Sequence, residues 1–137
     1  MSSRRTQWII LVCGDIITLA LVTGLGFARH GTLGSAGLRM LTTFIPLLIA
    51  WFAVAPFLGA YDLGHANKLA ELWRPGWAMV LAAPLAAWLR GAWLNAPILP
   101  IFVLVLGGFS TMAILTWRAA YSLIFSRRLM APRVQNG

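Results

Sequence analysis

Four long apolar stretches dominate the sequence and constrain what the chain can fold into. They cover about residues 8–27, 40–61, 73–93 and 98–121. A helix needs about 20 mostly apolar residues to cross the roughly 30 Å hydrocarbon core of a bilayer. Strands that cross a membrane instead alternate in polarity over about 10 residues, and these stretches are continuously apolar. The sequence therefore predicts an all-α, polytopic membrane protein with four transmembrane helices.

The composition excludes several other classes of protein. Hydrophobic residues make up 60% of the chain and charged residues 10%, whereas soluble domains are about 45–50% apolar and about 25% charged. A soluble monomer is therefore excluded, and so is a disordered chain, which needs low hydrophobicity. Cys13 is the one cysteine, so a disulfide scaffold is excluded as well. A length of 137 residues predicts one domain over residues 1–137.

The positive residues predict the orientation of the chain. With the N-terminus inside, eight of the eleven Lys and Arg residues fall in cytoplasmic segments and three in outer segments. Cytoplasmic loops carry the excess of Lys and Arg, so both termini are expected in the cytoplasm. The short loops predict an up-down-up-down four-helix bundle. The net charge of +8 then reflects topology and attraction to anionic lipid heads, and no nucleic-acid partner is expected.

Asp15 is the most informative single residue. It lies seven residues after Trp8, which is roughly 10 Å along a helix, and a carboxylate at that depth costs about 2.5–3.5 kcal/mol on insertion scales. Arg118, near the cytoplasmic end of the fourth span, comes close to the same depth. We expect an Asp15–Arg118 pair between the first and fourth spans, with Thr18 one turn away. A structural ion pair, a protonated Asp15 bonded to backbone, and a proton or ion relay all remain open.

Other ionisable residues are candidates for ligand binding. Arg29, His30 and Arg90 are predicted near the outer surface, where a cationic cluster could bind an anionic ligand or a lipid head, or could simply mark span ends. His30 at the outer face and His65 at the inner face could each ligate a pigment or haem iron. They lie on opposite sides of the membrane, so they cannot bind one metal together.

Residues for catalysis are scarce. The sequence has no Cys/His cluster, no paired carboxylates on one helix face, no nucleophile elbow and no phosphate-binding glycine loop. We therefore expect no catalytic residues and no metal site, and we assign no cofactor.

Small residues recur at helical spacing in the third span. Such rows let membrane helices approach closely, so they predict packing faces inside the bundle or against another subunit. One row is Ala78, Ala82 and Ala86, and its neighbour is Ala83, Ala87 and Gly91.

The order and spacing of several motifs resemble a known family. These motifs extend from about Trp8 to Tyr121, and together they are similar to the small prokaryotic integral membrane family known as domain of unknown function 3054. The resemblance implies a four-helix membrane protein, and it supplies no activity, substrate or cofactor. We expect the chain in the cytoplasmic membrane of a prokaryote. The motifs are Gly14-Asp15, Arg29-His30-Gly31, Pro46 with Trp51, Pro56-Phe57-Leu58-Gly59-Ala60-Tyr61, Pro84 with Arg90, and Trp117-Arg118.

Two functions follow as hypotheses. The first is a non-catalytic accessory or interaction subunit of a larger membrane complex, for which a pigment-containing complex is one host. Its partners would be the lipid bilayer and other membrane subunits or further copies of the chain. The alternative is a small homo-oligomeric transporter or channel that uses Asp15 with Arg118.

Overall fold

The computed structural model describes residues 3–28 and 36–130, and within these two ranges every regular element is a helix. The described part of the chain is therefore all-α, as predicted. The elements are α1 (Arg4–Ala28), α2 (Ala36–Val54), the 3-10 helix η1 (Ala55–Leu58), α3 (Leu63–Ala66), the 3-10 helix η2 (Leu69–Glu71), α4 (Trp73–Leu94) and α5 (Pro100–Met130).

In the described part of the chain, four segments are long and apolar enough to cross a membrane, which agrees with the four predicted spans. They are Arg4–Ala28, Gly37–Leu58, Leu69–Leu94 and Pro100–Arg127. The fourth helix differs most from its predicted bounds, because α5 has 31 residues and continues to Met130. At about 1.5 Å per residue it is longer than the hydrocarbon core is thick.

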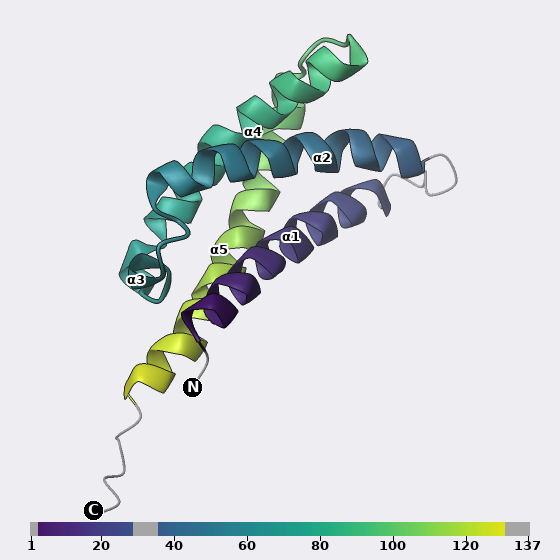
Figure 1. The fold of residues 1–137 in the computed structure, drawn as a ribbon. Helices are drawn as coiled ribbons and strands as arrows, with labels where there is room; N and C mark the ends of the chain where they lie inside the picture. Colours follow the sequence, from purple (N-terminus) through teal and green to yellow (C-terminus); the bar gives the residue numbers. More distant parts are fainter. Residues whose placement is uncertain (1–2, 29–35, 131–137) are drawn as a thin grey trace, which may run out of the picture.

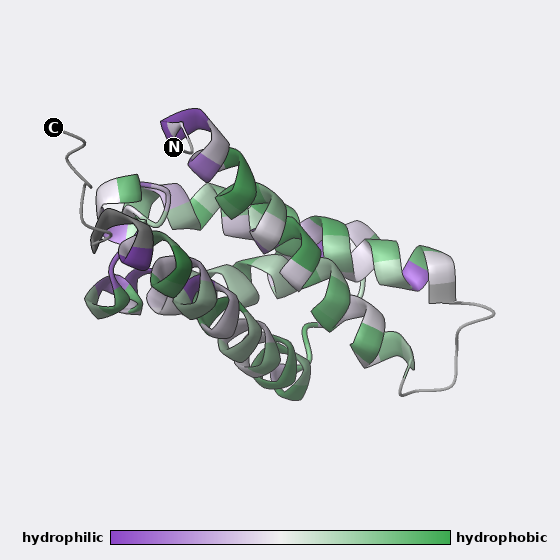
Figure 2. Cartoon of the chain, turned by 90° about the horizontal axis from the view of Figure 1, so that it is seen from below, coloured by the Kyte–Doolittle hydropathy of each residue, from purple (hydrophilic) through white to green (hydrophobic). Residues whose placement is uncertain are grey.

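The four long helices form a ring in which each packs against its neighbours in the chain. Helix α2 packs on α1 and α4, α4 packs on α5, and α5 returns to contact α1 (Figure 1). The start of α1 and the end of α5 lie at the same end of the molecule as α3 (Figure 1). Hydrophobic residues cover most of the helix length, and hydrophilic residues gather mainly near this end (Figure 2).

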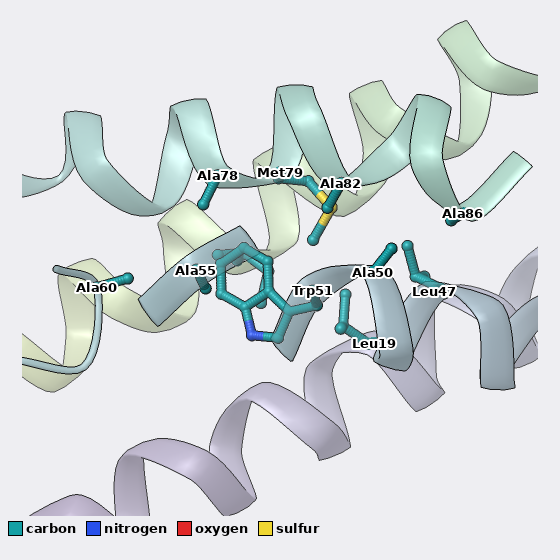
Figure 3. Close-up of a cluster of buried hydrophobic side chains, with 11 residues drawn as sticks. Leu19, Leu47, Ala50, Trp51, Ala55, Ala60, Ala78, Met79, Ala82 and Ala86 are labelled. Carbon is teal, nitrogen blue, oxygen red and sulfur yellow. The ribbon is translucent and has the colours of Figure 1, made fainter. Parts of the chain in front are cut away.

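Alanines form the core face of α4. Both predicted rows are buried: Ala78, Ala82, Ala83, Ala86, Ala87 and Gly91. The first row packs with Leu47, Ala50 and Trp51 of α2, and the large Trp51 ring lies among these small side chains (Figure 3). Small residues on one helix and a tryptophan on the other allow the two backbones to approach while the interior stays filled.

The turn after α2 depends on two residues that favour special backbone geometry. Pro56 lies in η1, where it is near the N-terminus of a helical turn that does not need its missing N–H. Gly59 ends η1 with φ of 71°, in the left-handed region that glycine adopts without a steric penalty. The chain therefore reverses here and places the Ala60 carbonyl against Arg118 of α5.

The polar connection between α2 and α4 is held by its own side chains. The Asp62 carboxylate caps α3 by accepting a hydrogen bond from the Gly64 N–H at 2.8 Å. Arg74 donates through Nε to Glu71 Oε2 at 2.6 Å and through Nη1 to the Leu58 carbonyl at 2.9 Å. The Arg74 contacts therefore tie the start of α4 to the end of η1.

Two adjacent glycines on α5 offer a matched test of the α4–α5 packing. A Cβ added at Gly107 would lie 2.9 Å from the Ala83 Cβ, whereas one added at Gly108 meets nothing within 4 Å. We expect Gly107→Ala to separate α4 from α5 at a cost of about 1–3 kcal/mol. Thermal unfolding in detergent should show a lower midpoint for Gly107→Ala and an unchanged or higher one for Gly108→Ala. Equal midpoints would contradict this packing.

Candidate functional site

The candidate site is built around Asp15, which projects from α1 into the interior and is 0% exposed. Arg118 of α5 forms a bidentate ion pair with it. Arg118 donates through Nε to Oδ1 at 3.0 Å and through Nη2 to Oδ2 at 2.6 Å. The structure thus brings together the two residues of the pair that depth matching predicted. The third predicted member does not take part, because the Thr18 hydroxyl donates to the Gly14 carbonyl of its own helix at 2.7 Å.

Three aromatic side chains complete the coordination of Asp15. Trp117 Nε1 donates to Oδ1 at 3.1 Å, while Trp51 Nε1 and the Tyr61 hydroxyl donate to Oδ2 at 3.1 and 2.5 Å. The Trp51 N–H is shared, since it also lies 2.8 Å from the Tyr61 hydroxyl oxygen. We call Asp15, Arg118, Trp51, Tyr61 and Trp117 the Asp15 centre.

The five contacts that described residues make with the carboxylate come from N–H and O–H groups, and this favours its ionised form. A carboxylate has about four lone-pair sites and no proton to give, so it suits an environment made only of N–H and O–H groups. A neutral carboxylic acid would present its own O–H to this set, in which only the Tyr61 hydroxyl oxygen could accept it, and that oxygen already lies 2.8 Å from the Trp51 N–H nitrogen. The geometry therefore fits an ionised Asp15 whose charge is balanced by Arg118.

The guanidinium of Arg118 also makes contacts outside the ion pair. Its Nη1 donates to the Ala60 carbonyl at 2.5 Å, and its central carbon lies 5.0 Å from the centre of the Tyr61 ring. Arg118 itself is 2% exposed. A buried ion pair is tolerated when further hydrogen bonds satisfy the remaining groups of both ions. The Asp15 centre supplies further hydrogen bonds to both ions, and it joins α1, α2 and α5 to the turn after η1.

Gly14 makes the approach of Trp117 possible. A Cβ at this position would lie only 1.9 Å from Cζ2 and 2.2 Å from Cε2 of the Trp117 ring. The indole therefore occupies the space that any other residue at position 14 would fill. The Gly14-Asp15 pair thus combines an opening for Trp117 with the acceptor for its N–H.

A narrow hollow leads from the polar connection to Arg118. Its walls include His65, Lys68, Glu71, Arg74 and Arg118, and its volume of about 10 Å³ has room for about one water molecule. His65 Nδ1 lies 3.6 Å from Glu71 Oε2, and Nε2 lies 3.8 Å from Asp62 Oδ2. Each ring nitrogen thus lies near a carboxylate, beyond hydrogen-bond distance.

The predicted outer cluster is only partly described. Arg90 Nε donates to the Thr43 hydroxyl at 3.2 Å, and its guanidinium lies 5.0 Å from the centre of the Phe102 ring. Arg90 therefore links α2, α4 and α5. Arg29 and His30 lie outside the described residues. Across residues 3–28 and 36–130, no group of three or more His, Cys, Asp or Glu side chains could hold a metal ion.

Sequence reasoning missed the three aromatic donors. One signal pointed to Trp51, because it lies in the middle of a span while the other tryptophans lie near span ends. An indole N–H in hydrocarbon needs an acceptor, and Asp15 is the one carboxylate that the sequence places inside a span. Trp117 and Tyr61 carried no comparable signal, since both occupy positions typical of interface aromatics.

Comparison with known proteins identifies a family and no characterised relative. The model of the family described as Protein of unknown function (DUF3054) matches residues 12–121, which include the whole Asp15 centre. No curated protein and no solved structure matches the chain. The match covers most of the chain, and the resemblance noted from the motifs is confirmed. The chain therefore belongs to the family described as Protein of unknown function (DUF3054).

Proposed function

We propose that this protein is a non-catalytic accessory or interaction subunit of a larger membrane complex. The observation that carries the proposal is the saturation of the Asp15 centre, in which the carboxylate receives five donors and is 0% exposed. A group that carries protons or ions must exchange partners during each cycle. A carboxylate held by five donors instead suits a fixed clamp that keeps the bundle in one shape.

The proposal includes the placement of the chain in the membrane. The spans run up-down-up-down in the cytoplasmic membrane of a prokaryote, with both termini in the cytoplasm. Support comes from the excess of Lys and Arg in the segments assigned to the cytoplasm. The start of α1, α3 and the end of α5 also share one end of the molecule (Figure 1).

Mild detergent extraction from the native membrane tests the subunit proposal. The chain should migrate with a complex much larger than 15.0 kDa, with other subunits present in fixed ratio. An absorption spectrum of the same fraction examines His30 and His65, because pigment bands lost in His65→Ala or His30→Ala would identify the ligand. A colourless homo-oligomer without other subunits would contradict the proposal.

The alternative is a small homo-oligomeric transporter or channel that uses Asp15 with Arg118. The hollow that ends at Arg118 favours it, since water entering there would reach one member of the buried ion pair. Proton flux into reconstituted vesicles, measured with a pH-sensitive dye under a potassium gradient, distinguishes the two functions. The subunit proposal expects flux equal to that of empty vesicles. Flux in the wild type that Asp15→Asn abolishes would favour the transporter instead.

A further inference from the structure

A groove opens on the lipid-facing side of the bundle between α4 and α5. Its volume is about 320 Å³, and it is shallow and broadly open along one side. It exists because Gly76 has no side chain: a Cβ there would lie 3.6 Å from Leu115 Cδ2, and a longer side chain would fill the space. The lining residues are Leu72, Trp73, Gly76, Trp77, Val80, Thr111 and Leu115.

The groove presents an apolar surface to its occupant. Its one hydroxyl belongs to Thr111, and this group already donates to the Gly107 carbonyl at 2.7 Å. Trp73 and Trp77 are both more than half exposed, and indoles favour the headgroup layer at the edge of the hydrocarbon. The groove therefore suits a hydrocarbon chain whose polar end lies near Trp73.

The polar end of the groove meets the narrow hollow described above. Leu72 lines both spaces. The Arg74 guanidinium lies 4.6 Å from the centre of the Trp73 ring, so one cation stands directly at the junction. Lys68, Arg74 and Arg118 line the hollow. Arg118 is paired with Asp15 and Arg74 with Glu71, so Lys68 and the remaining N–H groups of Arg74 are the groups that can meet an anionic head. An anionic head at its mouth would be complementary in charge, and basic pockets between membrane helices bind such heads.

We propose that this juxtaposition is a binding site for one anionic phospholipid. An acyl chain lies in the groove over Gly76, and the phosphate lies at the mouth of the hollow beside Lys68 and Arg74. The head stays outside the hollow, which has room for about one water molecule only. The site is independent of the Asp15 clamp and of the subunit proposal.

Native mass spectrometry of the full chain in detergent tests the site. The probes are phosphatidylglycerol and phosphatidylcholine with the same acyl chains. The wild type should retain one phosphatidylglycerol and discriminate against phosphatidylcholine. Gly76→Leu fills the groove and should weaken retention of phosphatidylglycerol about tenfold, since burial of each methylene contributes to binding. Lys68→Glu should weaken it about fivefold or more and leave phosphatidylcholine unchanged.

Matched variants separate loss of the site from general damage. Gly24→Leu introduces the same side chain on α1 where nothing lies within 4 Å, and Arg127→Glu reverses an exposed charge near the end of α5. Both should retain phosphatidylglycerol like the wild type. If Gly76→Leu fails to fold, Val80→Trp fills the groove from a residue that is 48% exposed.

Three results would overturn the proposal. If the wild type retained the two lipids equally, Lys68 and Arg74 would not select an anionic head. If Gly76→Leu and Gly24→Leu retained phosphatidylglycerol equally, the lipid would not bind in the groove. A non-lipid apolar compound, or a second copy of the chain cross-linked through Val80→Cys, would show that the occupant is something else.

Discussion

Asp15→Asn and Arg118→Met are each expected to destabilise the bundle by about 3–5 kcal/mol, because each leaves a buried polar partner uncompensated. In Asp15→Asn, the new amide group adds donors to a space where all five neighbouring contacts are already donors. In Arg118→Met, a buried carboxylate loses its counter-ion. Unfolding by a denaturing detergent in mixed micelles measures both effects.

The double variant distinguishes a coupled pair from two independent residues. Asp15→Asn combined with Arg118→Met removes both charges, so its loss should be smaller than the sum of the two single losses. Arg127→Met removes an exposed arginine from the same helix and should change stability by less than about 0.5 kcal/mol. Additive losses would mean that the two residues do not act as a pair.

Gly14→Ala is expected to be the most damaging single-methyl change in α1. The added Cβ would lie 1.9 Å from the Trp117 ring, and Trp117 is itself packed against Tyr121, with ring centres 6.0 Å apart. The indole must leave, so overpacking costs about 1–3 kcal/mol and the lost hydrogen bond to a charged group about 1.5–3 kcal/mol more. Thermal unfolding followed by size-exclusion chromatography measures the loss.

Two variants test the cause of this loss. Gly24→Ala makes the same change ten residues further along α1, in open space, and should be neutral or slightly stabilising. Trp117→Phe shortens the ring that occupies the space beside Gly14. In that background Gly14→Ala should cost much less than in the wild type. A wild-type midpoint for Gly14→Ala would refute the close packing of Trp117.

The sequence predicted the parts of the fold that depend on hydropathy and depth. Long apolar runs specify membrane helices because the bilayer requires about 20 such residues. The small-residue rows of α4 are buried as their spacing indicated. Asp15 and Arg118 could be matched because a buried charge needs a partner at its own depth, and few charged residues lie inside the spans.

The rest of the Asp15 centre depends on rotation and close approach, which hydropathy does not encode. The contact of Trp117 requires the missing side chain of Gly14, and the contact of Tyr61 requires the reversal at Gly59. The outer cationic cluster of Arg90 with Arg29 and His30 stays a prediction, because the latter two lie outside the described residues. The sequence did not indicate that Arg90 also donates to Thr43 on a neighbouring helix. A surface charge and an interhelical hydrogen bond look the same in sequence, since both occur near span ends.

The charge state of Asp15 is the most direct test of the clamp, and the chain is well suited to measure it. It contains two aspartates, Asp15 and Asp62. In an Asp62→Asn variant, aspartate labelled with a heavy carbon isotope in the side-chain carboxyl marks Asp15 alone. The heavy isotope lowers the infrared frequencies of the labelled group. In lipid at neutral pH, the spectrum should show the symmetric and antisymmetric stretching bands of an ionised carboxylate at these lowered frequencies. A single shifted C=O band of a neutral acid would contradict the five-donor clamp.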